Sequence, residues 1–114
     1  MRKTFKLYKL YELYKLTLMF RHIVCFKLAD STPEKCAKAR EVLLSMRQNV
    51  PLAKHIEVYV DELHSARSFD VMLQVDLASF ADLDAYQNDP YHCDVVKKHM
   101  HAVAERSIAM DFEL

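Results

Sequence analysis

Two side chains in one short segment have the chemistry to exchange a proton with a small ligand: Tyr86 and His92, within the stretch 84–92. Asp89 is a good N-cap and Pro90 suits the first position of a helix, so His92 is expected in the first helical turn. The positive end of the helix dipole disfavours an imidazolium there, and a neutral His92 could accept a proton. Tyr86 could then donate a hydrogen bond to a carbonyl oxygen on which charge builds. The pair therefore predicts proton abstraction beside a carbonyl group.

A third candidate is His22, which alternates with Val24 and Phe26 along an apolar run. Residues two apart on a strand share a face, so His22 is expected to point towards the helices and to line the same apolar pocket. The alternative is structural: the two histidines bond to backbone groups or to each other, and Tyr86 completes the core.

The elements that must position these residues follow from hydrophobic periodicity and from helix caps. The sequence predicts strands over 20–28, 55–61, 69–77 and 107–114, with a loop over 62–68. It predicts one helix from Ser31-Thr32-Pro33-Glu34 to before Pro51, a short helix over 79–86 that Ser79 and Asp82 open as a capping box, and a longer helix from Pro90. The order βαββαβ indicates the α+β class and a ferredoxin-like fold, with a four-stranded antiparallel sheet and helices on one face.

In the longer helix, a common face is expected for His92, Val95, Val96, His99 and Val103. One face of the sheet has no helix to cover it. That face is expected to carry Ile23, Cys25, Tyr59, Met72, Gln74 and Ala109. The set is too apolar for a fully solvated surface, which predicts a homodimer formed through the sheet face.

Composition excludes several classes of function. The 114 residues suffice for one domain; sixteen basic and sixteen acidic residues give no net charge, so nucleic acid is not an expected partner. Glycine is absent, which excludes glycine-rich nucleotide-binding loops. The three cysteines form no CxxC pair, and their odd number indicates a reducing, cytoplasmic setting. No cofactor or metal is expected, since His99 and His101 point about 200° apart on a helix.

Residues 1–18 form a triplet repeat of the kind Lys-Leu-Tyr, whose period of three does not hold one face of an α-helix. Charges interrupt it too often for a membrane span or an export signal. We expect an N-terminal extension outside a domain of residues 19–114; the alternative is an amphipathic arm that docks on a partner or a membrane surface.

Three motifs, at residues 21–28, 85–92 and 110–113, together resemble the stress-responsive α/β-barrel domain (Dabb) family over residues 19–114. The resemblance implies a dimeric α/β barrel. In a plant polyketide cyclase branch of the family, the histidine that matches His92 is the proposed base for an aldol-type ring closure. The tyrosine that matches Tyr86 assists at the substrate oxygen, and His22 matches a third site position. That branch has a further histidine where this chain has Val71.

Three functions stay open at this point, and with them the question of whether the protein is an enzyme. The first is cofactor-free acid/base chemistry on a small carbonyl compound bound in an apolar pocket. The second is a non-enzymatic stress-associated or ligand-binding barrel, and the third is a cofactor-independent monooxygenase. A cavity of a few hundred Å3 on which the tips of His22, Tyr86 and His92 converge favours a site, whereas a closed interior favours a structural role.

Overall fold

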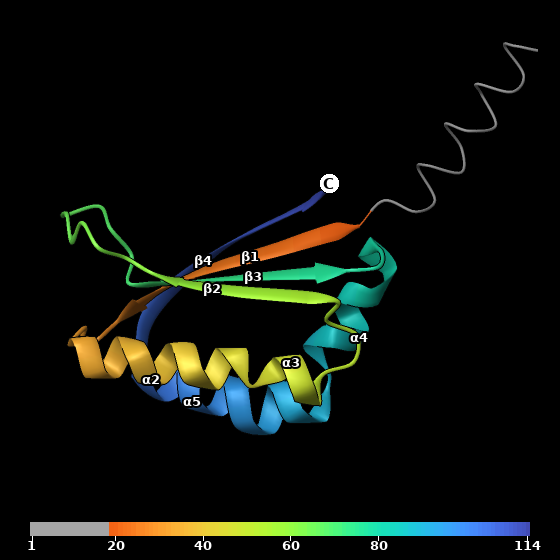
Figure 1. Ribbon diagram of the computed structural model, residues 1–114, viewed down its shortest axis with the longest axis horizontal. Coiled ribbons are helices and arrows are strands. Elements are labelled where there is room, and N and C mark those ends of the chain that lie inside the picture. Colours follow the sequence, from red (N-terminus) through yellow and green to blue (C-terminus); the bar gives the residue numbers. More distant parts are fainter. Residues whose placement is uncertain (1–18) are drawn as a thin grey trace, which may run out of the picture.

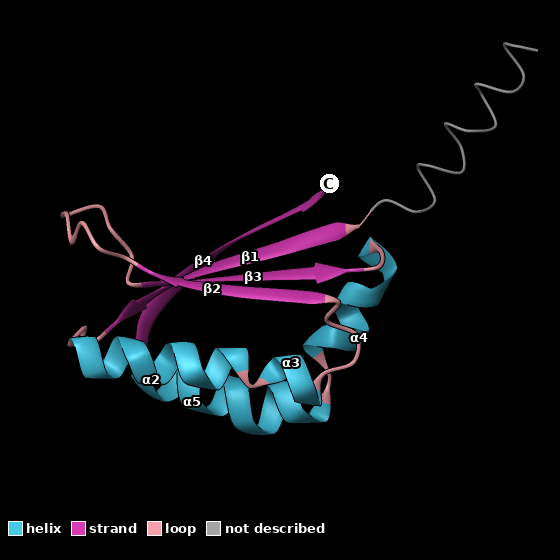
Figure 2. Cartoon of the chain, viewed as in Figure 1, coloured by secondary structure: helices cyan, strands magenta, loops and turns pink. Residues whose placement is uncertain are grey.

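The computed structural model describes residues 19–114, so the expected extension 1–18 lies outside the described residues. Figures 1 and 2 show a sheet with helices on one side of it. The elements, in chain order, are β1 Phe20–Leu28, α2 Pro33–Leu44, α3 Met46–Asn49, β2 His55–Val60, β3 Val71–Leu77, η1 Phe80–Asp82, α4 Leu83–Gln87, η2 His92–Lys97, α5 Lys98–Val103 and β4 Ala104–Glu113. Here η1 is a 3-10 turn and η2 is a π-helical stretch. All four predicted strands are present, and β4 begins three residues earlier than predicted.

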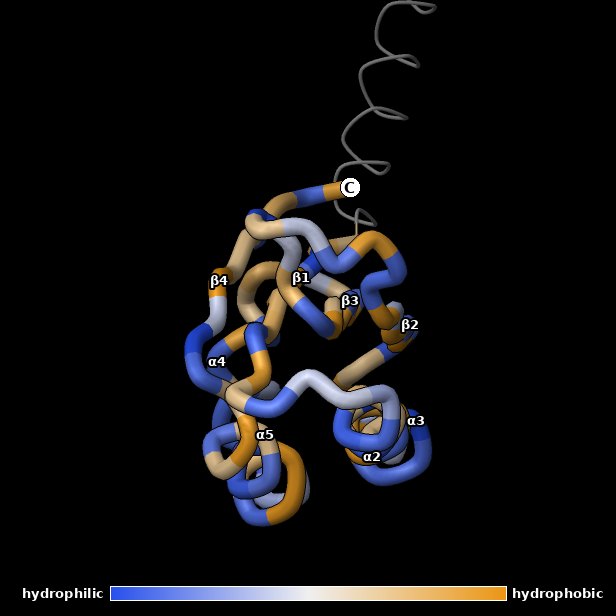
Figure 3. The backbone as a smooth tube through the Cα atoms, turned by 90° about the vertical axis from the view of Figure 1, so that its left-hand side faces the viewer, coloured by the Kyte–Doolittle hydropathy of each residue, from blue (hydrophilic) through white to orange (hydrophobic). Residues whose placement is uncertain are grey.

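The sheet has the strand order β2-β3-β1-β4 with every neighbouring pair antiparallel. The chain therefore has the predicted α+β, ferredoxin-like fold. Figure 3 shows α2 and α3 beneath β2 and α5 beneath β4, so the two helical segments lie side by side in one layer under one face of the sheet. The register places His22 opposite Val75 on one side and Asp111 on the other.

The first helical segment is interrupted once. The Thr32 hydroxyl accepts a hydrogen bond from the Lys35 amide at 3.3 Å, which caps the start of α2, and Pro33 follows at the first helical position. The prediction was a single helix, but Ser45 separates α2 from α3, and its hydroxyl donates to the Val42 carbonyl at 2.5 Å. Hydroxyl bonds of this kind to a preceding carbonyl bend helices. As predicted, the segment ends before Pro51.

The second helical segment breaks where the proline predicted it. Asp89 accepts a hydrogen bond from the His92 amide at 3.0 Å, so Asp89 caps the helix that starts at Pro90. At the earlier start the prediction was wrong: Ser79 makes no capping hydrogen bond, and a 3-10 turn precedes α4.

A π-helical stretch, η2, changes which residues of this helix are buried. The predicted face included Val95, which is in fact exposed, while His92, Val96 and Met100 are buried. A π turn contains more residues than an α turn, because its hydrogen bonds run from i to i+5. The buried positions therefore recur every four residues, and Val95 rotates outwards.

The uncovered sheet face carries Ile23, Cys25, Tyr59, Met72 and Gln74, in agreement with the predicted alternation. Ala109 was placed on this face wrongly. It pairs with Val24 and so points towards the helices, whereas Ile108 and Met110 occupy the uncovered face, with 56% and 68% of their surface exposed. The predicted alternation of 107–114 was right, but which of the two alternating sets points towards the helices depends on the β1–β4 register.

The core lies between the sheet and the helices, and its most deeply buried members include Ala39, Leu43, Met46, Val75 and Leu77. All three cysteines are unpaired thiols. Within residues 19–114 no helix is both long and apolar enough to cross a bilayer. The cytoplasmic location stays a prediction.

Candidate active site

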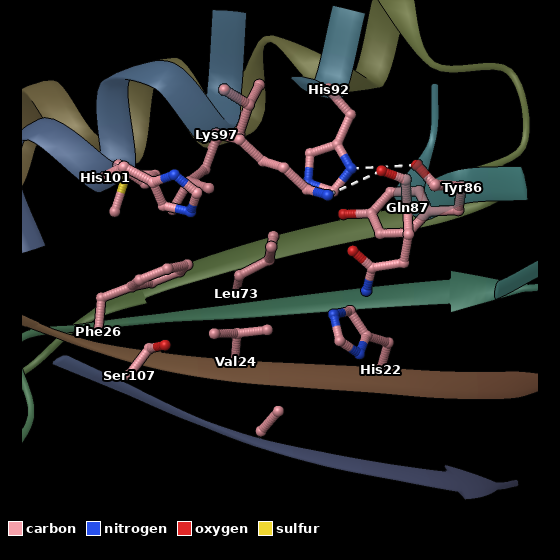
Figure 4. A pocket seen from close by; sticks show the side chains of 14 residues that line it. His22, Val24, Phe26, Leu73, Tyr86, Gln87, His92, Lys97, His101 and Ser107 are labelled. Atoms are coloured by element: carbon pink, nitrogen blue, oxygen red, sulfur yellow. Dashed lines mark hydrogen bonds between the residues drawn. The ribbon is translucent and has the colours of Figure 1, made fainter. Parts of the chain in front are cut away.

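A cavity of about 240 Å3 lies between the sheet and the second helical segment. Figure 4 shows His92, Lys97 and His101 reaching from the helices towards the sheet and His22 reaching back from β1. The cavity walls come from three strands, β1, β3 and β4, and from α2, α4, η2 and α5. The lining residues are His22, Val24, Phe26, Leu43, Leu73, Tyr86, Gln87, His92, Val96, Lys97, Met100, His101, Ser107 and Ala109. Thus the three residues predicted from sequence, His22, Tyr86 and His92, all border one cavity.

The break between α4 and η2 fixes the tautomer of the neutral His92 ring. The ring nitrogen Nδ1 lies 3.0 Å from the Tyr86 carbonyl oxygen, which can only accept, so Nδ1 carries the proton and Nε2 of a neutral ring has the lone pair. Every buried side-chain nitrogen or oxygen among residues 19–114 has a hydrogen-bond partner. Because Nε2 of His92 has no such partner, it is open to the cavity.

The pKa of His92 lies below the ordinary value of 6.5. The largest cause is burial, which disfavours the charged ring; the nearby Lys97 and His22 act in the same direction, while the Tyr86 carbonyl and Asp89 oppose it. The sequence predicted a neutral ring from the helix dipole, and in the structure burial is the largest cause that lowers the pKa of His92.

Tyr86 is buried and packs against both histidines of the site. Its ring stacks on the His92 ring at a centroid distance of 4.4 Å and meets the His22 ring edge-on at 5.9 Å. The side chain has 0% exposed surface, and its hydroxyl donates to the Met46 sulfur at 3.7 Å. Burial, with Asp89 second, raises the pKa of Tyr86 above its usual value. The predicted bond from Tyr86 to a substrate oxygen thus stays a prediction. The contacts of the residue are the stacking of its ring on His92 and the bond from its carbonyl oxygen to the His92 ring.

His22 forms a cross-strand pair with Asp111. The distance from Nδ1 of His22 to Oδ1 of Asp111 is 2.5 Å, so the carboxylate accepts from Nδ1. The other nitrogen, Nε2, is without a protein partner and is open to the cavity by the same argument as for His92. An aspartate that orients a histidine in this way stabilises the ring when it takes up a proton. His22 therefore has the geometry to deliver or receive a proton on the sheet side of the cavity.

Sequence reasoning missed Asp111, Lys97 and His101. Asp111 was hidden because its position opposite His22 depends on the β1–β4 register. Lys97 was hidden because the π-helical stretch turns it towards the cavity. Its Nζ atom donates to the Gln87 carbonyl at 2.8 Å. The sequence did contain a signal for Lys97, namely the end of a helix at Asn88. The last carbonyls of a helix lack intrahelical partners and attract donors such as a lysine amine.

The backbone carbonyls of Tyr86 and Gln87, at the end of α4, organise the site. The Tyr86 carbonyl accepts from the His92 ring, and the Gln87 carbonyl accepts from Lys97. The broken helix therefore fixes the orientation of both side chains through its own backbone, and the proline break explains why they meet at the cavity.

No group of three or more histidine, cysteine or acidic side chains within residues 19–114 is placed to hold a metal ion. His99 and His101 diverge, as their spacing predicted, and only His101 borders the cavity. The arrangement has two histidine nitrogens open to an apolar cavity, a cationic amine at its helical wall and no acidic side chain among the lining residues. It can accept a proton, return one and hold an oxygen atom that carries negative charge.

Several solved structures have a similar fold. A dimeric ferredoxin-like protein of unknown function from Thermobifida fusca is 23% identical, with 85% of this chain and 92% of that chain covered and a TM-score of 0.72. A hydroxynitrile lyase from Passiflora edulis is 17% identical, with 86% and 94% covered and a TM-score of 0.68. A Dabb family protein with a ferredoxin-like fold from Mesorhizobium loti is 18% identical, with 83% and 95% covered and a TM-score of 0.64.

A search of curated proteins found no significant match to the chain. The sequence profile of the stress responsive A/B barrel domain matches residues 20–114, which are nearly all of the residues that form the fold. The strand order and the helix layer of the chain agree with that match. The chain is a member of the stress responsive A/B barrel domain (Dabb) family.

Proposed function

We propose that this protein catalyses cofactor-free acid/base chemistry on a small carbonyl compound, with His92 as the general base. The observation that carries the proposal is the state of the His92 ring: Nδ1 is committed to the Tyr86 carbonyl, and Nε2 is free and faces the cavity. A lowered pKa keeps that ring neutral near neutral pH, which is the state a base requires.

The reaction begins with proton transfer to Nε2 of His92 from a carbon or hydroxyl group next to the carbonyl carbon. The electron pair of the broken bond moves onto the carbonyl oxygen or into a new bond at the neighbouring carbon. In an aldol-type ring closure the electron pair forms a bond to the carbon of a second carbonyl group of the same compound, and the oxygen of that group takes up a proton from Nε2 of the His22 imidazolium, whose Nδ1 is bonded to Asp111. His22 becomes neutral, and solvent then takes the proton from His92 and returns one to His22. A polyketide-cyclase-like ring closure uses these steps. The neighbour from Passiflora edulis is a hydroxynitrile lyase, and cleavage of a hydroxynitrile likewise needs a base at a hydroxyl group and an acid for the leaving cyanide.

The test uses deuterium exchange at the carbon next to the carbonyl group of phenylacetone, followed by proton NMR in heavy water. This exchange reports proton abstraction without knowledge of the natural substrate. We expect the protein to accelerate exchange above buffer and His92→Gln to lose about a hundredfold of that acceleration, within the ~10²–10⁴ range of general base catalysis. The matched control is His99→Gln, on the same helix but outside the cavity lining. Equal exchange rates in the two variants would refute the role of His92.

We also infer that two copies of the chain associate through the uncovered sheet face. Ile108 and Met110 are 56% and 68% exposed there, beside Cys25 and Ile23 on the neighbouring strand. A contiguous apolar face of this kind is typical of an interface. Met110→Glu should shift the mass measured by light scattering from dimer to monomer. Leu63→Glu, at a site 79% exposed in the β2–β3 loop, should not. A monomeric wild-type protein at micromolar concentration contradicts the inference.

A further inference from the structure

We propose that the ligand of this cavity carries a carboxylate group, which Lys97 and His101 bind at the helical wall beside His92. The inference rests on the proposed function, since it concerns the ligand of the same cavity, and it adds a substrate class: small, largely apolar carboxylic acids.

The first argument is the balance of charge around the cavity. Its ionisable lining residues are three histidines, Tyr86 and Lys97, and no aspartate or glutamate lines it. Two carboxylates lie near the site without lining the cavity: Asp111 is paired with His22, and Asp89 accepts from the His92 amide. Among residues 19–114, none of the ion pairs includes Lys97. The cavity therefore presents a cation without a counter-ion.

The second argument is the placement of Lys97. Its partly buried amine donates to the Gln87 carbonyl at 2.8 Å, a neutral acceptor that uses one of its three N–H groups. Figure 4 shows the amine next to the His92 ring, with the side chain of His101 reaching towards the cavity from further along the helix. A carboxylate oxygen at this wall would receive a charge-assisted hydrogen bond, which is about twice as strong as a neutral one.

The third argument is the helix geometry that aims Lys97. The next residue, Lys98, is exposed and does not line the cavity. Lys97 therefore reaches the cavity because of its position on the helix, and a lysine one residue further along does not. The π-helical stretch ends at Lys97. Such stretches occur frequently at functional sites.

The volume of the cavity and its apolar walls indicate what the part of the ligand beyond the carboxylate is like. A cavity of about 240 Å3 is smaller than the ~300–1,000 Å3 typical of drug-sized ligands. Val24, Phe26, Leu43, Leu73, Val96 and Met100 supply its apolar surface. The fit is to a one- or two-ring acid, with the ring on the aliphatic side chains and the carboxylate at Lys97.

The test compares two probes of the same shape and different charge, 2-naphthoate and 2-naphthalenemethanol, by titration calorimetry at low salt. The wild-type protein should bind the acid at least tenfold more tightly than the alcohol. Lys97→Met should lower the affinity for the acid about tenfold and leave that for the alcohol unchanged. Lys97→Arg should restore most of the preference. Lys98→Met, which removes the same charge one residue away, should bind both probes like the wild type.

Equal affinities of the wild-type protein for the two probes would overturn the inference. So would an equal loss of acid binding in Lys97→Met and Lys98→Met, which would show a general charge effect. Neither result depends on the basicity of His92, because calorimetry measures binding and the exchange assay measures proton abstraction. A protein that accelerates deuterium exchange but binds both probes equally would contradict the carboxylate site and leave the proposed function standing. A protein that prefers the acid but does not accelerate exchange would contradict the proposed function and leave the carboxylate site standing.

Discussion

The buried hydroxyl of Tyr86 offers a test of how the site is built. Tyr86 and Tyr91 lie five residues apart on either side of the helix break, and each hydroxyl has one partner. Tyr86 donates to the Met46 sulfur at 3.7 Å, whereas Tyr91 donates to the Ser45 hydroxyl at 2.7 Å. Replacement of each tyrosine by phenylalanine removes one oxygen atom and retains the ring.

The two substitutions should have different effects on the free energy of unfolding. A thioether sulfur is a weak acceptor, so the Tyr86 hydroxyl gains little from its partner, while its burial costs about 1–3 kcal/mol. Tyr86→Phe should therefore leave the free energy of unfolding unchanged or raise it by up to about 1 kcal/mol. Tyr91→Phe removes an ordinary hydrogen bond and should lower the free energy of unfolding by about 0.5–1.5 kcal/mol.

Urea titration of both variants measures the difference in the free energy of unfolding. The protein concentration is kept the same, because dimer formation would make the apparent stability depend on concentration. A Tyr86→Phe protein that is less stable than Tyr91→Phe would refute the reasoning. The exchange assay adds a second readout. If the ring and carbonyl of Tyr86 orient His92, Tyr86→Phe retains exchange; if the hydroxyl serves the substrate, as the sequence predicted, exchange falls.

Three further predictions concern other parts of the fold. The pKa of His92 in the folded protein lies below 6.5, so near and below that pH the unfolded chain binds more protons than the folded one. The free energy of unfolding, measured by urea titration, should therefore fall as the pH drops through 6.5. His92→Gln should flatten this part of the pH curve. Ala109→Leu should fill the cavity and weaken 2-naphthoate binding at least tenfold in calorimetry, while Ala102→Leu, exposed and outside the cavity lining, should not. Thr32→Ala should lower the free energy of unfolding by about 1 kcal/mol, and Ser79→Ala, which removes no cap bond, should leave it within about 0.5 kcal/mol; equal effects would contradict the cap assignment.

The fold was readable from sequence because its signals are local. Alternation marked the strands, and Pro33, Pro51 and Pro90 marked helix boundaries within a residue or two. The break at Ser45 was not readable, because a serine within a helical pattern has no fixed effect until its hydroxyl finds a carbonyl.

The site was predicted in part, and the missing part has a common cause. His22, Tyr86 and His92 border one cavity, as expected from strand alternation and from the capped helix. Asp111 and Lys97 depend on long-range register and on helix winding, which no local pattern specifies. The direction of the Tyr86 hydroxyl was equally out of reach, since it depends on Met46, forty residues away in the chain.

The π-helical stretch separates the orientation of Lys97 from that of His92. A π turn holds about one residue more than an α turn, so a one-residue deletion between Cys93 and Val96 would let the stretch wind as an α-helix and leave Lys97 on the cavity side. The same residues wound as an α-helix without a deletion would turn Lys97 away from the cavity by one residue's rotation, about 100°, while Asp89 still caps the helix ahead of His92. A change in helix winding alone can therefore remove the charge from the helical wall and leave the base in place.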